Sequence, residues 1–291
     1  MVGWFIIRRL NIIDENELFE LDYDNHKVTN TFIGDARIVT IDNFFKNPDQ
    51  VTDFVYNTPF SKSKDVNANF PGIRSKVWVD KTSLNNFYQD ILINEFKENK
   101  YKPKLSNINI NAIDSDFRGD FKGQYTDKSF QPHTDSLPWQ NPFRFRQLFA
   151  STVWLNKSEE CSGGTSFWRN KVINSQSFLS KKSLGNSWEQ LKTLPSFANE
   201  FEKWNTQWWD YEFRDVTNTQ WYEDVINKYQ NSYNVKNETW WTESNENWEL
   251  LDITEMKYNR MVVYQGIYFH SQYMKKNAFV DYPRISFQIF F

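Results

Sequence analysis

Residues 284 to 291, Arg-Ile-Ser-Phe-Gln-Ile-Phe-Phe, alternate polar and apolar side chains with a period of two. On an extended strand, residues two apart share a face, so Arg284, Ser286 and Gln288 lie on one side and apolar side chains on the other. Pro283 fits the first residue of such a strand, where no ladder hydrogen bond is lost. An arginine and a serine on one face can hold a carboxylate by a bidentate fork and a hydroxyl, although an arginine at a sheet edge can also pair with a surface acid.

The segment Gln131-Pro-His-Thr-Asp135 offers two side chains that bind metals. His133 and Asp135 are two residues apart, so on an extended segment both reach the same ion at about 2.0–2.2 Å. His270, which precedes Arg284, supplies a second imidazole. Two histidines and one carboxylate on one face of a metal leave positions open for a co-substrate and dioxygen, as in non-heme iron(II) oxygenases.

Two strand-like runs lie between the two parts of this ligand set. Residues 146–155 are β-branched and aromatic, and residues 161–168 read Cys-Ser-Gly-Gly-Thr-Ser-Phe-Trp. The paired glycines permit a tight turn with positive φ before a strand resumes. Residues 261–264 then predict a buried strand, 265–266 a turn, and 267–270 the strand that carries the second histidine.

In this order, H-x-D, Gly-Gly-Thr-x-Phe, a distal histidine and R-x-S resemble the iron(II)/2-oxoglutarate-dependent oxygenase superfamily. The glycine segment is similar to that of prolyl-hydroxylase-like members, and with Phe70-Pro-Gly-Ile-Arg74 it resembles a little-characterised bacterial and phage branch. The resemblance implies an α+β fold with a mainly β core. That core would be a double-stranded β-helix, a jelly-roll or cupin-like barrel, with N-terminal helices packed on the sheet and a helical insertion.

The resemblance also implies the roles of the residues. His133, Asp135 and His270 would hold Fe(II), and Arg284 with Ser286 would anchor the distal carboxylate of 2-oxoglutarate. The implied activity is that of a dioxygenase, an oxidoreductase that consumes O2, releases succinate and CO2, and hydroxylates an unactivated carbon of an amino acid, a peptide side chain or a small metabolite. Related halogenases lack the carboxylate that Asp135 supplies, so hydroxylation is the default outcome, with desaturation and ring closure left open.

Two other classes of protein stay open at this point. One is a non-catalytic binding protein that keeps the barrel, and the other is a cupin-type metal enzyme that does not use 2-oxoglutarate. The R-x-S motif argues against the second, because such an enzyme needs no keto-acid anchor there. The substrate itself is not identified, and Trp139, Arg146 and Trp168 are candidate substrate contacts because they lie near the metal-binding strands in the sequence.

Composition limits the partners. The chain has 291 residues, 39% of them hydrophobic, and a net charge of −3 without a sustained basic stripe, so nucleic acid is not expected as a partner. No run of eighteen apolar residues predicts a membrane span, and the N-terminus does not have the order of a secretory signal, so we expect a cytoplasmic protein. Cys161 is the sole cysteine, so no internal disulfide forms. Because no histidine is near it in the sequence, we do not expect it to act as a catalytic thiol. The sequence does not indicate an oligomeric state.

One domain over residues 1–291 is expected to have three parts. Residues 1–120 form supporting strands and helices, including a strand at 37–45 and helices from Asn47 to Tyr56 and from Lys81 to Glu98. Residues 121–170 and 249–291 form the β core with the metal site. Residues 171–248 hold eight of the thirteen tryptophans and form an insertion or lid, in which the tryptophans line a substrate cleft or pack a small core of their own.

Overall fold

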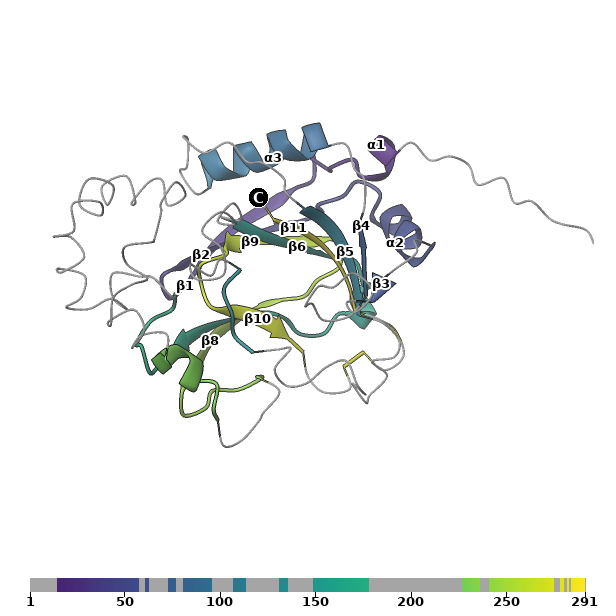
Figure 1. The fold of residues 1–291 in the computed structure, drawn as a ribbon. Coiled ribbons are helices and arrows are strands. Elements are labelled where there is room, and N and C mark those ends of the chain that lie inside the picture. Colours follow the sequence, from purple (N-terminus) through teal and green to yellow (C-terminus); the bar gives the residue numbers. More distant parts are fainter. Residues whose placement is uncertain are drawn as a thin grey trace, which may run out of the picture.

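The computed structural model describes residues 15–57, 61–62, 73–76, 81–95, 107–113, 131–135, 149–177, 227–235, 241–274, 278–279, 282 and 284–290. All structural statements below concern these residues. Within them the protein is rich in β structure, with two antiparallel sheets and few helices (Figure 1). The expected α+β class with a mainly β core is therefore confirmed.

The larger sheet has eight strands, and each pairs antiparallel with its neighbours. In spatial order they are β1 (Lys27–Ile33), β2 (Ala36–Asp42), β9 (Arg260–Gln265), β6 (Phe149–Trp154), β11 (Arg284–Phe290), β5 (Asn107–Ile113), β4 (Ile73–Lys76) and β3 (Ser61–Lys62). The C-terminal strand β11 thus lies inside the sheet, between β6 and β5. A polar side chain on its inner face is therefore held by a strand paired on both sides.

The smaller sheet has three strands in the order β10 (His270–Tyr273), β7 (Gly164–Asn170) and β8 (Trp248–Glu255). It lies below the larger sheet in Figure 1. A β-bulge interrupts the β7–β8 pairing between Phe167 and Trp168. On the other side of β10, the segment 131–135 adds an isolated antiparallel bridge between His133 and His270. A 3-10 helix, η5 (Ser158–Glu160), lies in the connection from β6 to β7.

The helices α1 (Glu15–Leu18), α2 (Pro48–Asn57) and α3 (Lys81–Asn94) lie on the face of the larger sheet that points away from the smaller one (Figure 1). Pro48 occupies the start of α2, where a missing N–H is no loss. The main core fills the space between the helices and the sheet. From the helical side it includes Leu18, Phe19, Val51, Val55, Phe87, Tyr88 and Ile91. From the sheet it includes Val39, Ile41, Val153, Met261, Val263, Ile285, Phe287 and Ile289.

The other face of the larger sheet meets the smaller sheet. The ring of Tyr264 on β9 packs edge-on against Phe167 on β7, with 5.2 Å between the ring centroids. The Arg284 guanidinium reaches from β11 toward the Gln272 side-chain oxygen on β10 and the Gly164 carbonyl on β7, at 3.4 and 3.5 Å. Apolar residues of β11 therefore serve the main core, while Arg284 crosses between the sheets, as the alternation in the sequence predicts.

Several boundaries differ from the expected ones. The strand expected at 267–270 begins only at His270, because residues 267 and 268 still belong to the turn that follows β9. The second helix ends at Asn94, and the strand expected at 37–45 is β2, which ends at Asp42 before an Asn43 with positive φ. Both sheets have open ends in the described part of the chain. No helix there is long and apolar enough to cross a membrane.

Candidate metal centre

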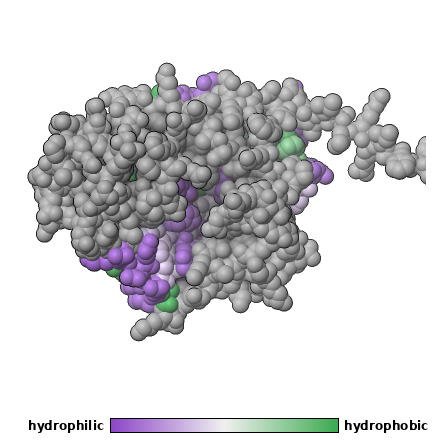
Figure 2. Space-filling model, viewed as in Figure 1, coloured by the Kyte–Doolittle hydropathy of each residue, from purple (hydrophilic) through white to green (hydrophobic). Residues whose placement is uncertain are grey.

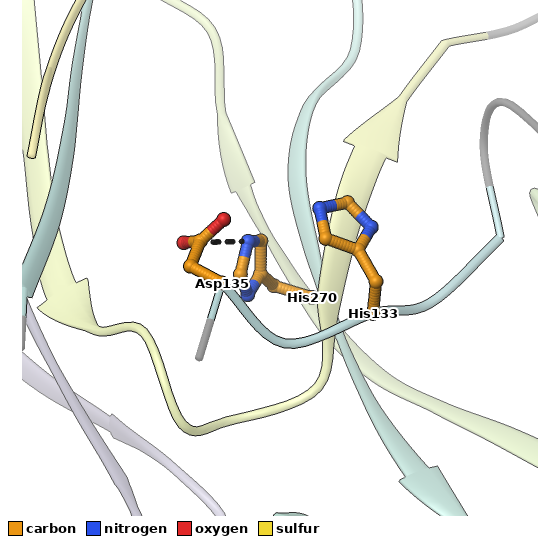
Figure 3. Close-up of side chains that lie close together, drawn as sticks. All are labelled: His133, Asp135 and His270. Atoms are coloured by element: carbon orange, nitrogen blue, oxygen red, sulfur yellow. Dashed lines mark ion pairs between the residues drawn. The ribbon is translucent and has the colours of Figure 1, made fainter. Parts of the chain in front are cut away.

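Three side chains that are distant in the sequence meet between the sheets. His133 and Asp135 come from the segment that bridges to β10, and His270 is the first residue of β10. One ligand atom from each of the three lies within 4.8 Å of the other two. The His270 Nε2 atom is 3.2 Å from the Asp135 Oδ2 atom, and Figure 3 shows all three side chains rising from the backbone in the same direction.

Backbone hydrogen bonds fix the relative position of these residues. His133 and His270 exchange two bonds, since the N–H of each donates to the carbonyl of the other at 2.9 Å. The Asp135 N–H donates to the Gly266 carbonyl at 2.8 Å, in the turn after β9. The short ligand segment is therefore attached to His270 itself and to the turn before it, and on this extended segment His133 and Asp135, two residues apart, share a face.

Both imidazoles are oriented by their own backbone. The Nδ1 atom of His133 is 3.0 Å from the Gln131 carbonyl, and the Nδ1 atom of His270 is 2.8 Å from the Tyr268 carbonyl. A carbonyl only accepts, so each Nδ1 carries the proton and donates it. Each neutral ring then presents an Nε2 lone pair, which is how outer hydrogen bonds prepare a histidine for a metal.

The distances suit a small cation. Donors at about 2.1 Å from one ion and at right angles to each other are about 3 Å apart. The Asp135–His270 pair already has this spacing at 3.2 Å, and His133 lies at the wider end of the 4.8 Å group. His133 is exposed and His270 is buried, so the centre is open on the side of His133. Two imidazoles and a carboxylate are the donor set of a facial triad, and they fit Fe(II).

The charges in the site are unevenly distributed. The His133 ring is open to solvent on one side but loses hydration among the surrounding protein atoms, and this desolvation, followed by the neighbouring His270, lowers its pKa against the smaller opposing effect of Asp135. Burial alone would lower the pKa of His270 too, but the charge and hydrogen bond of Asp135 and the Tyr268 carbonyl outweigh it and raise that pKa. Without a metal, a proton is thus shared most readily between His270 and Asp135, at the place where a cation would bind.

Arg284 is the other charged group between the sheets. Its side chain is 2% exposed, and no acidic side chain among the described residues forms an ion pair with it. Its Nε atom has no hydrogen-bond partner there, and the two contacts to Gln272 and Gly164 are long. Burial lowers its pKa to about 10, so it is still a cation at neutral pH. A buried cation with unused donors is a site for an anion.

Tyr264 lies between the metal-binding residues and Arg284. Its ring centroid is 4.6 Å from that of His270. Burial and then the charge of Asp135 raise the pKa of Tyr264 well above its ordinary value, while Arg284 opposes them. The phenol is therefore within the field of both charged groups and keeps its proton. Tyr264 and Gln272 were not expected from the sequence, although Gln272 is two residues after His270 on the same strand, a spacing that could have indicated it.

The other expected residues have different positions. Ser286 is buried on β11, paired through its backbone with Trp154 and Asn111. Trp168 is fully buried, and its indole N–H donates to the hydroxyls of Ser166 at 2.8 Å and Ser271 at 3.1 Å, which favours a packing role. The candidates Trp139 and Arg146 lie outside the described residues, as do six of the insertion's eight tryptophans, Trp188, Trp204, Trp208, Trp209, Trp221 and Trp240.

His26 and Cys161 lie apart from the triad. His26 contacts the Phe44 carbonyl through Nε2 at 3.0 Å and stacks on the Phe44 ring. Burial raises the pKa of the Cys161 thiol to about 11, so it is protonated at neutral pH and is a poor nucleophile. In the part of the insertion that the structure describes, Trp241 and Trp248 are buried and pack against each other. Trp241 also packs on Trp168 of β7 and Trp248 on Phe269, so both belong to the core of the smaller sheet, while Trp204, Trp208, Trp209 and Trp221, the candidates for a substrate cleft or a small core, lie outside the described residues.

Comparison with known proteins places the chain in a family. It belongs to the family described as "Family of unknown function (DUF6445)", which it matches over residues 24–192 and 205–290. Both the segment with His133 and Asp135 and the segment with His270 and Arg284 lie within the matched ranges. Searches of curated proteins and of solved structures found no match.

Proposed function

We propose that the protein is an Fe(II)- and 2-oxoglutarate-dependent dioxygenase that hydroxylates a carbon of an amino acid, a peptide side chain or a small metabolite. The observation that carries the proposal is the combination of two sites in one interior. A cluster of two histidines and one carboxylate is linked through β10 to a buried arginine: His270 begins this strand, and Arg284, which forms no ion pair with a described residue, contacts Gln272 two residues later. A metal ion alone would need only the cluster of histidines and carboxylate, and a simple anion would need only the arginine. A dicarboxylic keto acid uses both, because one end chelates the metal and the other end binds the arginine.

The roles of the chain's own residues follow from this. His133, Asp135 and His270 would bind the metal through Nε2, a carboxylate oxygen and Nε2. Arg284 would receive the distal carboxylate of 2-oxoglutarate, and Tyr264 would keep its proton for donation into the same interior. Iron(II) and 2-oxoglutarate, when bound, supply the oxidation, in which O2 is consumed, succinate and CO2 leave, and a substrate carbon gains a hydroxyl.

Arg284 also gives the site its selectivity. The guanidinium loses most of its hydration between the sheets, so a carboxylate placed there binds a cation that few other groups stabilise. Ser286 is on the same strand two residues later, and we assign its hydroxyl to the same carboxylate. The exposed side of His133 is where the organic substrate would approach. We further propose that the two sheets are the two halves of a double-stranded β-helix.

The test is an anaerobic titration of the protein with Fe(II) and 2-oxoglutarate, followed by addition of air. We expect a weak visible absorption band when both are present, and succinate after air is admitted. Arg284→Ala should retain the metal but lose the band at 2-oxoglutarate concentrations that saturate the wild type. His270→Ala should lose both metal and band.

Arg169→Ala is the matched control, because Arg169 is an arginine of β7 whose side chain is 34% exposed and pairs with Glu249 at 3.0 Å. It should titrate like the wild type. If Arg284→Ala binds 2-oxoglutarate with full affinity, the keto-acid assignment is wrong. If the wild type binds Fe(II) but never forms succinate with any amino acid or peptide tested, the protein is a binding protein and not this enzyme.

A further inference from the structure

Tyr233 connects the end of the aromatic-rich region to the segment that carries two metal ligands. Its hydroxyl donates to the carbonyl of Pro132, the residue directly before His133. Tyr233 is 101 residues away from Pro132 in the sequence. The contact is therefore tertiary, and it acts on the backbone of the ligand segment without touching the metal-binding atoms.

The hydroxyl belongs to a short relay. The Pro132 carbonyl can only accept, so Tyr233 gives its single proton there. The Tyr229 hydroxyl, 2.5 Å from that of Tyr233, then gives its own proton to the Tyr233 oxygen. Burial raises the pKa of Tyr229 to about 12 and that of Tyr233 well above the ordinary value, so both are protonated donors at neutral pH.

The relay is anchored to the smaller sheet at its other end. The Ser232 carbonyl accepts from the Trp248 indole N–H at 3.1 Å, and the Ser232 hydroxyl accepts from the Asn170 amide at 2.7 Å. Trp248 and Asn170 are on β8 and β7. Residue 233 thus directly follows a residue that is bonded to the central strand β7 and to the outer strand β8 of the smaller sheet.

The same aromatic group contacts the strand of the third ligand. The Tyr229 ring stacks on Phe269, with 5.6 Å between the centroids and 16° between the planes. Phe269 directly precedes His270 and is fully buried, and Trp248 packs edge-on against it at 5.1 Å. Tyr229 therefore contacts the residue before one ligand, while Tyr233 contacts the residue before another.

The ligand segment needs such support. Only a single bridge, His133 with His270, joins the described residues 131–135 to the sheet, together with the Asp135 bond to the Gly266 carbonyl. A strand of the sheet proper shares several such pairs with its neighbour, as β10 does with β7. The Tyr233 hydrogen bond adds a further attachment at Pro132, directly before the first ligand.

We propose that Tyr233 is a positioning residue for the metal centre: through the Pro132 carbonyl it holds the His133–Asp135 segment in register with His270. Tyr229 and the stacked Phe269 set the position of Tyr233 relative to the same strand. In this assignment, residues 229 to 233 help to position the metal-binding residues. The inference deepens the proposed function and rests on it for metal affinity alone.

The first test does not need a metal. Tyr233→Phe removes the hydroxyl and keeps the ring, and Tyr88→Phe is the matched control. Tyr88 is also buried, and its hydroxyl bonds to Ser151 at 2.7 Å within the main core, on the other face of the larger sheet. Amide hydrogen exchange in metal-free protein should speed up about 2- to 10-fold at residues 133 and 135 in Tyr233→Phe, and stay at the wild-type rate there in Tyr88→Phe.

The second test measures Co(II) affinity by the visible absorption of the bound ion. We expect Tyr233→Phe to bind Co(II) about tenfold more weakly than the wild type, and Tyr88→Phe to bind it equally well. Unchanged exchange at residues 133 and 135 in Tyr233→Phe, or an equal increase in both variants, would overturn the inference. A wild type that binds no Co(II) would count against the metal centre, while the exchange data would still decide the role of Tyr233.

Discussion

Arg284 is a residue that the fold accommodates at a cost. Moving a guanidinium out of water is unfavourable unless an acid and further hydrogen bonds compensate, and the described residues provide only two long contacts. We therefore predict that Arg284→Met, which keeps the length and removes the charge, is more stable than the wild type by about 1 kcal/mol. For a chain of this size that corresponds to a rise in Tm of about 2–4 °C.

Thermal unfolding of the two ligand-free proteins measures this directly. Arg169→Met is the control, because the Arg169 guanidinium is partly in water and bonded to Glu249. Its removal therefore recovers no lost hydration, and we expect no rise in Tm. A lower Tm for Arg284→Met than for the wild type would mean that the arginine stabilises the native state. It would then be a structural residue, and the argument for an anion site would lose its basis.

Asp42 gives a prediction about pH. Burial raises its pKa, but hydrogen bonds and charge from Arg260 and Lys257 outweigh this and lower it below the ordinary 3.8. Arg260 contacts both carboxylate oxygens, at 2.5 and 3.0 Å. A group whose pKa falls on folding stabilises the native state above its unfolded pKa. That contribution disappears as the pH drops through the folded value.

We expect Asp42→Asn to lower the free energy of unfolding by about 1 kcal/mol at pH 7, since the pair is bidentate and partly buried. The variant and the wild type should converge as the pH falls through the lowered pKa of Asp42, because the wild-type carboxyl is then protonated as well. Urea unfolding at several pH values measures both effects. Glu249→Gln, in the exposed pair with Arg169, should change the free energy of unfolding by no more than about 0.5 kcal/mol. If Glu249→Gln lost as much stability as Asp42→Asn, the partly buried Asp42–Arg260 pair would contribute no more than an exposed one.

At the scale of elements, the turn into β7 depends on two glycines. Gly163 has a φ of 77° and Gly164 a φ of 155°, which other residues rarely adopt. A Cβ on Gly163 would lie 2.0 Å from the Tyr273 carbonyl oxygen, and one on Gly164 equally close to the Thr254 oxygen. Both obstacles are backbone atoms of paired strands, so they cannot move aside without breaking the smaller sheet.

Gly163→Ala and Gly164→Ala are therefore each expected to destabilise the protein by more than about 3 kcal/mol. Gly34, in the β1–β2 turn, is the comparison. Its φ is 59°, and the nearest atom is the side-chain oxygen of Gln176, which can move aside by giving up its bonds to the Asp35 N–H and the Ile33 carbonyl without displacing a strand, so Gly34→Ala should cost about 2 kcal/mol. Chemical unfolding ranks the three variants, and an equal cost for all of them would mean that strain in φ, and not backbone contact, sets the penalty.

Elements with a clear local signal could be predicted from the sequence. Strand β11 follows from its period-two alternation, and α2 follows from Pro48 with a cap before it. Strands β1 and β5 were missed because β1 is almost fully exposed and β5 reads Asn-Ile-Asn-Ile-Asn-Ala-Ile, rich in a residue that disfavours strands. The β structure of β1 comes from a local hairpin with β2 across Gly34 and Asp35, a turn that the sequence could have indicated, whereas β5 pairs with the distant β11, which only the tertiary fold supplies.

At the scale of the whole molecule, the three metal-binding residues and Arg284 could be named from residue type and order, since the chain has only three histidines. The residues that surround these four could not be predicted from the sequence. Tyr264 on β9 faces His270 from the other sheet, with 4.6 Å between the ring centroids, and Tyr233 reaches Pro132 across 101 residues. Periodicity reports which way a side chain points, but it holds no information about which strands become neighbours.

The last prediction concerns the stability of the whole fold when its proposed ligands bind. A ligand that binds only the native state stabilises it by about 2.7 kcal/mol at a hundred times its Kd. Mn(II), which replaces Fe(II) without oxidation, should raise the Tm of the wild type, and 2-oxoglutarate should raise it further. Because the two ligands use different residues, Arg284→Met should keep the first increase and lose the second, whereas His270→Ala should lose both. An Arg284→Met protein that 2-oxoglutarate stabilises as strongly as the wild type would show that the keto acid binds elsewhere, and a His270→Ala protein that Mn(II) still stabilises would place the metal away from the triad.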